Sequence, residues 1–228
     1  MAVYHYDRTY TEVANRYNSG NRLCIAVGGD SHARRLWEQF LTSETRYIFP
    51  NLRIFDVHFG ISGGLARTYM SESRSVNVFE RDRHQNLNIV VLMIGSNDPD
   101  QDPGTTAWQI TRDIESIVKD LTRKGKIVYV VQIPSRHTFR SATANDYCRI
   151  NRSIGHKLSR MLKNRYIPLP PRSYQREAFA CERYRGRIAL VHLTPERYSD
   201  LADSIFRHID NDLQNFASMP SSLSIYNK

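Results

Sequence analysis

The sequence predicts an α/β fold, a three-layer α/β/α sandwich with a central parallel sheet of about five strands. Two observations lead to this prediction. Short apolar runs rich in β-branched residues recur along the chain, and amphipathic stretches with helical spacing separate them. Strands that alternate with helices form crossover units, and these units place parallel strands between two layers of helices.

The predicted strands are nearly continuous in apolar character. Such runs are typical of strands that are buried on both faces of a parallel sheet. Four of them are RLCIAVGG (22–29), LRIFDVHF (52–59), LNIVVLMIG (87–95) and KIVYVVQIP (126–134). A further strand-like segment, IALV, stands directly before His192 and completes a sheet of about five strands.

Three stretches have the periodicity of helices. Residues 104–125 repeat apolar side chains at helical spacing, and Gly125 is placed to end that helix. Residues 144–162 repeat apolar side chains four apart. The last helix is predicted to begin with Thr194 as its N-cap and Pro195 in its first turn.

The organisation of the chain favours one domain. A length of 228 residues suits one sizeable core, and no linker rich in Gly, Pro or Ser divides the sequence. We expect a single domain over 1–228, with its core at about 22–216 and frayed tails at 1–10 and 218–228. The irregular stretch 166–187 is predicted to be a long loop that leads to the last strand-like segment.

Composition favours an intracellular protein, cytoplasmic or nuclear, without a membrane span. No apolar run approaches the length of a span, and the first twenty residues lack the apolar core of a signal peptide. Three cysteines at wide, irregular spacing argue against a disulfide framework and favour a reducing compartment. These are Cys24, Cys148 and Cys181.

The net charge of +9 is concentrated in one part of the chain. Residues 136–187 contain thirteen Lys or Arg and three acidic residues, whereas the rest has nineteen basic and twenty acidic residues. Arginine supplies 26 of the 32 basic groups, and its planar fork suits phosphate and carboxylate. The segment is either a solvated basic face or a surface for an anionic substrate or partner such as nucleic acid.

Unusual residues stand where the predicted strands end. VGGDSHARRL places Ser31 after the first strand, FGISGGLA follows the second, and IGSNDPD places Asn97 after the third. His192 follows the last strand-like segment. Binding and catalytic sites of parallel sheets form beyond the carboxyl ends of the strands. Taken singly, these features are also typical of an N-cap serine, turn glycines, an Asn–Asp turn and a core histidine.

Together and in this order, the four blocks resemble those of the SGNH hydrolase superfamily, also called the GDSL esterases and lipases. The resemblance runs from about Leu23 to Ile209. The first block (GGDS) and the third (IGSND) match well, the second (ISGG) acceptably, and the fourth (VHLT) in part. The resemblance implies the flavodoxin-like SGNH hydrolase fold and a serine esterase.

The resemblance also implies a role for each of four residues. Ser31 would be the nucleophile, and its backbone N–H would be one oxyanion donor. Gly63 would provide a second backbone N–H, with Gly64 as an alternative, and the side-chain amide of Asn97 a third donor. His192 would be the general base, because an imidazole in reach of a serine hydroxyl can accept its proton near neutral pH.

The fourth block departs from the family pattern at one position. Members of the superfamily usually have an acid three residues before the histidine, and this chain has Ala189 there. Three explanations remain open. A main-chain carbonyl orients the histidine, another acid replaces the missing one, or activity has been lost. The nearest acids in sequence are Glu182, Glu196 and Asp200, and the last two are expected on the final helix.

The predicted function is therefore hydrolysis of a small or medium acyl ester, with an anionic substrate if the arginines face the cleft. The arginines nearest the predicted site are Arg136, Arg140, Arg183, Arg185 and Arg187. The alternative is a catalytically impaired SGNH-like binding domain that engages nucleic acid or another polyanion through residues 136–187. The resemblance allows this alternative, because SGNH-like esterase domains also occur in the proteins of some retrotransposons. No cofactor or metal is expected, because no dinucleotide, Walker or metal-ligand spacing occurs.

Overall fold

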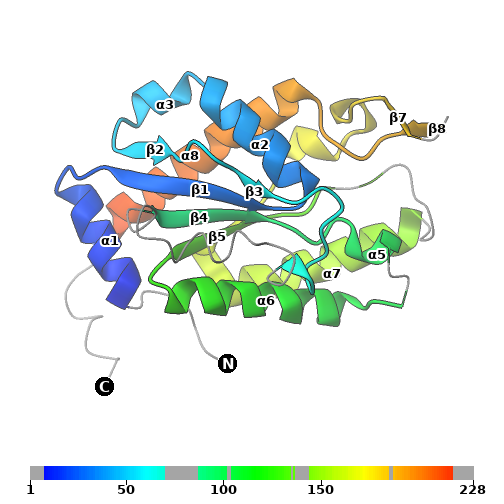
Figure 1. The fold of residues 1–228 in the computed structure, drawn as a ribbon, viewed down its shortest axis with the longest axis horizontal. Helices are drawn as coiled ribbons and strands as arrows, with labels where there is room; N and C mark the ends of the chain where they lie inside the picture. The colour runs from blue at the N-terminus through cyan, green and yellow to red at the C-terminus, as the bar shows by residue number, and fades with distance from the viewer. Residues whose placement is uncertain are drawn as a thin grey trace.

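A computed structural model describes residues 8–69, 87–101, 104–134, 136, 144–184 and 187–217. Its central sheet has six parallel strands in the order β2-β1-β4-β5-β6, and the short β3 also pairs with β1 (Figure 1). These strands are β1 (Leu23–Gly29), β2 (Leu52–Ile54), β3 (Phe59–Gly60), β4 (Leu87–Met93), β5 (Ile127–Val131) and β6 (Tyr166–Ile167).

Helices cover both faces of the sheet, which confirms the predicted three-layer α/β architecture (Figure 1). One face carries α1 (Arg8–Asn18), α2 (Ser31–Thr42), α3 (Thr45–Ile48) and α8 (Pro195–Ala217). The other carries α6 (Ala107–Arg123) and α7 (Ala144–Leu162), and the short α5 (Asp98–Gln101) follows β4. Three 3₁₀ turns complete the described helical structure, at Lys163–Arg165, Pro171–Tyr174 and Arg176–Ala178.

The side chains of the central strands alternate between two hydrophobic cores. On β4, Ile89 and Val91 face the core beneath α2 and α8, whereas Val90 and Leu92 face the core beneath α6 and α7. Both sets are buried, as expected for strands covered on both faces. This burial explains why the strands read as continuous apolar runs in the sequence.

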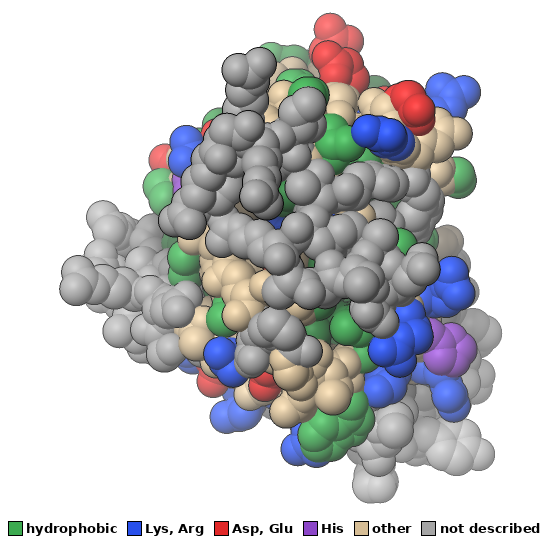
Figure 2. Space-filling model, turned by 90° about the vertical axis from the view of Figure 1, so that its right-hand side faces the viewer, with side chains coloured by type: hydrophobic (Ala, Val, Ile, Leu, Met, Phe, Trp, Pro, Cys, Tyr) green, Lys and Arg blue, Asp and Glu red, His purple; other side chains and the backbone are tan. Residues whose placement is uncertain are grey.

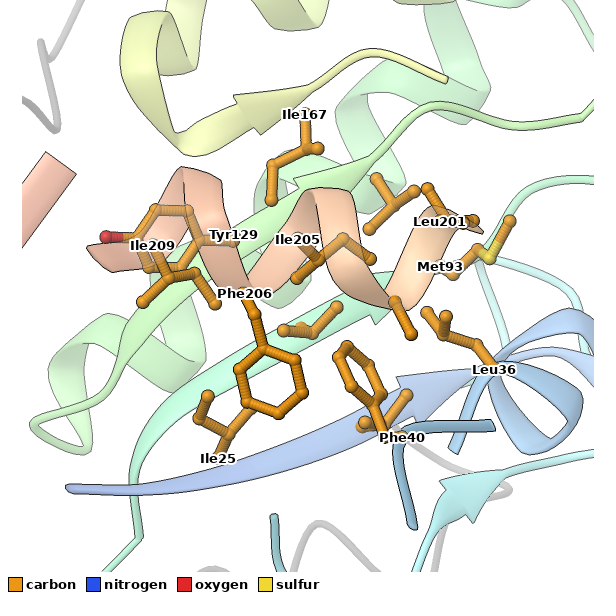
Figure 3. Packing of buried hydrophobic residues seen from close by; sticks show 14 of the residues in the cluster. Ile25, Leu36, Phe40, Met93, Tyr129, Ile167, Leu201, Ile205, Phe206 and Ile209 are labelled. Carbon is orange, nitrogen blue, oxygen red and sulfur yellow. The ribbon is translucent and has the colours of Figure 1, made fainter. Parts of the chain in front are cut away.

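Aromatic packing joins α2 to α8 above the sheet. The rings of Phe40 and Phe206 meet edge to face, with centroids 5.0 Å apart, and both side chains are fully buried (Figure 3). Ring pairs in this geometry stabilise beyond the apolar area that they bury. The contact fixes the helix that begins at Ser31 against the helix that follows His192.

The predicted helix boundaries are confirmed where the caps are clear. A capping box between Thr106 and Gln109 begins α6, and Gly125 follows its end with φ of +74°. The hydroxyl of Thr194 accepts the N–H of Arg197 at 3.4 Å, so Thr194 caps α8 as predicted.

Two predictions about strands were wrong. The run at 52–59 forms two short strands, β2 and β3, rather than one. The fifth strand in the sheet order is β6, which lies in the stretch 166–187 that was predicted to be a loop. With two residues, β6 is too short to show any periodicity in sequence.

The segment before His192 is also not part of the parallel sheet. It forms β8 (Arg187–Ala189), which pairs antiparallel with β7 (Glu182–Tyr184) in a separate two-stranded sheet. An apolar run shows that a segment forms a strand but does not identify the partner strand. His192 therefore lies between β8 and α8 rather than at the exit of a central strand.

The N-terminal boundary differs from the prediction as well. Helix α1 begins at Arg8, and the side chain of Tyr10 is only 1% exposed, so residues 8–10 are not a frayed tail. The tail predicted at 218–228 lies outside the described residues. Within the described part of the chain, no helix has the length and apolar character needed to cross a bilayer.

Candidate functional site

Ser31 is the first residue of α2, at the carboxyl end of β1. The N-cap is Asp30, whose side chain accepts the N–H of His32 at 2.9 Å. Among the described residues, the backbone N–H of Ser31 has no acceptor. It lies in the positive field of the helix N-terminus, where developing negative charge is stabilised.

A chain of polar contacts runs from the Ser31 hydroxyl through three further side chains. Ser31 Oγ lies 2.8 Å from His192 Nε2, and His192 Nδ1 lies 2.8 Å from Glu182 Oε2. The other carboxylate oxygen of Glu182, Oε1, lies 2.6 Å from Nη2 of Arg35. Ser31 and Arg35 are four residues apart on α2, so the first and last residues of this series of contacts lie on one face of the helix.

Backbone contacts hold the segment that carries His192. The carbonyl of His192 accepts the N–H of Ala180 at 2.8 Å, and Phe179 and Leu193 form an isolated antiparallel bridge. The N–H of Thr194 donates to the carbonyl of Ala178 at 2.8 Å. These contacts fix the backbone of the histidine and of the two residues that follow it.

Of the three acids considered from the sequence, the structure brings Glu182 to His192. In the β7–β8 hairpin Glu182 pairs directly with Ala189, the position where the family usually has its acid. Glu196 is exposed and hydrogen-bonds Thr194, and Asp200 pairs with Arg197. Both lie on α8, as predicted, and both are engaged away from the histidine.

The surroundings of His192 favour its neutral form. Burial lowers the pKa of His192, and the positive charge of Arg35 lowers it further, while the hydrogen bond to Glu182 acts in the opposite direction. An ionised carboxylate can only accept hydrogen bonds, so the neutral ring has its N–H at Nδ1 and donates a hydrogen bond from there to Glu182. The lone pair of Nε2 then points to the Ser31 hydroxyl.

A second buried histidine packs beside the first. The ring of His32 lies 4.9 Å from the ring of His192, centroid to centroid, and its Nδ1 lies 2.6 Å from the hydroxyl of Tyr198. Burial lowers the pKa of His32 well below its usual value, so the ring is neutral at neutral pH. His32 therefore supports one side of the His192 ring without adding a charge.

The two candidate glycines differ in what their backbone N–H groups do. The N–H of Gly64 donates to the carbonyl of Ile61 at 3.0 Å, within a turn. The N–H of Gly63 has no acceptor among the described residues, and Gly63 has φ of +75°, a conformation that glycine adopts readily. Gly63 is thus the better placed of the two to donate to a ligand.

The side-chain amide of Asn97 has a defined orientation. Its oxygen accepts a hydrogen bond from Nη2 of Arg136 at 2.7 Å, and its nitrogen donates to the carbonyl of Gly64 at 3.1 Å. A guanidinium only donates, so the oxygen must face Arg136 and the N–H₂ group must face the glycine loop. That group has a second N–H available for a ligand.

Hydrogen bonds tie the first three sequence blocks into one network. The carboxylate of Asp30 accepts from the hydroxyl of Ser96 at 2.7 Å, which joins the first block to the third. The N–H of Ile61 donates to the carbonyl of Gly29 at 2.9 Å, which joins the second block to the first. The bond from Asn97 to Gly64 joins the third block to the second.

Arg136 is one of the arginines named above as candidates to face a cleft, and the structure buries it instead. Its side chain is 6% exposed and forms an ion pair with the buried Asp100, Nη1 to Oδ2, at 3.1 Å. A buried cation needs such partners, because desolvation is otherwise too costly. The side chains of the other four candidate arginines lie outside the described residues: Arg140, Arg183, Arg185 and Arg187.

No group of His, Cys, Asp and Glu side chains suited to a metal ion occurs within the described residues. The carboxylate of Glu182 already has two partners, the imidazole of His192 and the guanidinium of Arg35. The described side chains bring together a serine hydroxyl, an imidazole and nearby N–H donors, which can support nucleophilic chemistry.

Solved structures with the same fold include several esterases. The chain resembles a carbohydrate acetylesterase family member from Sinorhizobium meliloti, with a TM-score of 0.59 and 14% identity over 84% of this chain and 99% of that one. It also resembles a member of the lipolytic protein G-D-S-L family from Veillonella parvula, with a TM-score of 0.56 and 13% identity over 81% of this chain and 97% of that one.

A third likeness is to the lipase/acylhydrolase from Enterococcus faecalis, with a TM-score of 0.54 and 14% identity over 83% of this chain and 96% of that one. No protein-family model and no curated protein matches the sequence. At these identities the likenesses establish the fold alone, and that fold is the α/β architecture predicted from the sequence.

Sequence reasoning missed several residues around Ser31. Arg35 could have been identified from its helical spacing, because a residue four positions after the serine lies on the same helix face. His32 follows the serine directly, but nothing in the sequence indicates that Tyr198 is its partner. The contact between Arg136 and Asn97 joins two strand ends and has no local signal.

Proposed function

We propose that this chain is a serine esterase of the SGNH or GDSL type. The observation that carries the proposal is the 2.8 Å contact between Ser31 Oγ and His192 Nε2, at the carboxyl edge of a sheet whose fold is that of known esterases. A serine hydroxyl needs such a base within hydrogen-bond reach to become a nucleophile. The imidazole is neutral and is therefore ready to accept the proton.

The proposed reaction has two steps. In the first, Nε2 of His192 accepts the hydroxyl proton while Oγ of Ser31 bonds to the ester carbonyl carbon. The bond to the leaving alcohol then breaks, and the imidazolium returns the proton to that alcohol. In the second, His192 accepts a proton from water, the water oxygen attacks the acyl-serine, and the acid leaves as Ser31 regains its proton.

Backbone and side-chain N–H groups would stabilise the oxyanion of each tetrahedral intermediate. The candidates are the N–H groups of Ser31 and Gly63 and the second amide N–H of Asn97. Each has no acceptor among the described residues, which supports this assignment. Where one such donor has been removed from a serine hydrolase, the cost was about 3–4 kcal/mol of transition-state stabilisation.

A small or medium acyl ester is the proposed substrate. The carbohydrate acetylesterase and the lipase/acylhydrolase among the similar structures support ester chemistry without selecting an acyl chain. Arg136 gives no support for an anionic substrate, because Asn97 and Asp100 already bind its guanidinium. A substrate carboxylate or phosphate would have to meet arginines other than this one.

Hydrolysis of p-nitrophenyl esters from acetate to octanoate tests the proposal. We expect turnover that falls by about a thousandfold or more in Ser31→Ala and in His192→Ala, because each removes a member of the nucleophile–base pair. Ser159→Ala and His156→Ala on α7 are matched controls and should retain wild-type rates, since both side chains lie away from the site.

Folded protein without Ser31-dependent turnover of any of these esters would contradict the proposal. It would then favour the alternative of a binding domain for nucleic acid or another polyanion. Binding of that kind should weaken steeply as the salt concentration rises.

A further inference from the structure

The β7–β8 hairpin places a carboxylate beside Ala189, the position at which this sequence lacks the acid of the SGNH pattern. Position 189 has no carboxylate, but the antiparallel register pairs it with Glu182 on the neighbouring strand. Directly paired residues of two antiparallel strands lie side by side. An acid at position 182 is therefore about as close to His192 as an acid at position 189 would be.

Glu182 makes two contacts with different chemical consequences. One carboxylate oxygen is 2.8 Å from Nδ1 of His192, and the other is 2.6 Å from the guanidinium of Arg35. The first contact fixes the tautomer and the rotation of the imidazole. The second fixes the carboxylate itself, because Arg35 comes from α2, the helix that also begins with Ser31.

We infer that Glu182 and Arg35 together replace the acid that the fourth block lacks, with Glu182 orienting His192 and Arg35 clamping Glu182 to α2. Both are positioning residues, since neither is placed to touch the reacting ester. The inference rests on the proposed esterase function, which it deepens by naming what orients the base. It also explains how a hairpin outside the central sheet can complete a site built at the edge of that sheet.

The protonation of His192 gives a test that does not depend on turnover. The charged and titratable groups around the ring are Glu182 on β7, Arg35 and His32 on α2, and Arg136 after β5. NMR titration of the His192 ring should show a lower pKa in Glu182→Gln than in the wild type, because the carboxylate no longer stabilises the imidazolium. An unchanged pKa of His192 in this variant would overturn the inference.

A double-mutant cycle tests the role of Arg35. We expect Glu182→Gln to lower kcat/KM by about 100-fold or more, by analogy with loss of the orienting acid in serine hydrolases. Arg35→Met should lower it by roughly tenfold in the wild-type background and by much less in the Glu182→Gln background, because the clamp then has nothing to hold. Arg35→Lys should lower kcat/KM less than Arg35→Met does, because lysine keeps the positive charge beside Glu182.

The same helix offers a matched control pair. Arg34 and Glu38 form an ion pair at 3.2 Å, with side chains that are 61% and 47% exposed. We expect Arg34→Met and Glu38→Gln to leave kcat/KM and the pKa of His192 unchanged, since exposed pairs contribute little. The midpoint of thermal unfolding should be measured for every variant. Values within a few degrees of the wild type would show that a variant loses activity without unfolding.

The two proposals fail in different ways. Wild-type activity that depends on Ser31 but survives both Glu182→Gln and Arg35→Met would overturn the inference and leave the esterase proposal intact. A lowered pKa of His192 in Glu182→Gln, in a protein that hydrolyses no ester, would support the Glu182 contact and contradict the esterase. Additive effects of the two substitutions would overturn the clamp by Arg35.

Discussion

At the scale of single residues, the site depends on a histidine that stays neutral and on a serine that is held at a helix N-terminus. Burial and nearby positive charge lower the pKa of His192, so Nε2 keeps its lone pair at neutral pH. The capping by Asp30 fixes the backbone at Ser31, and the positive end of α2 favours negative charge there. In the proposed reaction the neutral imidazole would accept the Ser31 proton, and the helix N-terminus would stabilise the oxyanion.

The pH dependence of turnover should report His192. A base works in its neutral form, so kcat/KM should rise with pH through the pKa of His192 and then level off. Because that pKa lies below its ordinary value of about 6.5, the rise should be centred below pH 6.5. A pH profile of ester hydrolysis measures this midpoint, and a rise centred well above pH 6.5 would contradict the assignment.

At the scale of elements, three segments meet at the site and each brings one part. Helix α2 supplies Ser31 and Arg35, the β7–β8 hairpin supplies Glu182, and the turn before α8 supplies His192. The packing of α2 against α8 holds Ser31 and His192 in fixed positions relative to each other. The carboxyl ends of β1 and β4 and the hairpin lie at the same end of the molecule (Figure 1).

Packing between α2 and α8 should therefore matter for stability. Phe206→Ala should lower the free energy of unfolding by about 3–5 kcal/mol, because it removes a fully buried ring and its contact with Phe40. Tyr47→Ala is a matched control on a side chain that is 71% exposed, and we expect a change within about 0.5 kcal/mol. Chemical denaturation measures both, and equal effects would contradict the described core.

The sequence predicted the elements whose patterns are long and local. Strands β1, β4 and β5 are continuous apolar runs, and α6 and α8 have clear caps, so these predictions were confirmed. Strand β6 was missed because two residues carry no period. The segment before His192 was recognised as a strand, but its partner β7 could not be, because pairing depends on contacts distant in sequence.

At the scale of the whole molecule, the basic segment 136–187 is less uniform than its composition suggests. Arg136 and Arg165 are buried, whereas Arg149, Arg152 and Arg160 on α7 are exposed. Figure 2 views the end of the molecule where α2 begins: some described basic side chains there lie beside acidic ones, whereas others gather around a histidine at the lower right. Two arginines of the segment thus serve the fold rather than a polyanion.

The candidate site shows the same division between local and distant information. Ser31 and His192 were chosen from short motifs, and the structure brings them to 2.8 Å. The sequence named Glu182 as one of three acids but could not select it, because the choice depends on the register of the β7–β8 hairpin. The sequence named Arg136 among five arginines near the site but could not predict its burial, because its pairing with Asp100 and Asn97 has no sequence signal.

The most direct measurement of whether Ser31 is an activated nucleophile is mass spectrometry of the protein after reaction with a fluorophosphonate. We expect one covalent adduct on Ser31, absent in Ser31→Ala and strongly reduced in His192→Ala, because the probe reacts with a serine whose proton an imidazole can accept. Folded wild-type protein that takes up no probe, or takes it up equally in His192→Ala, would contradict the central claim that His192 activates Ser31.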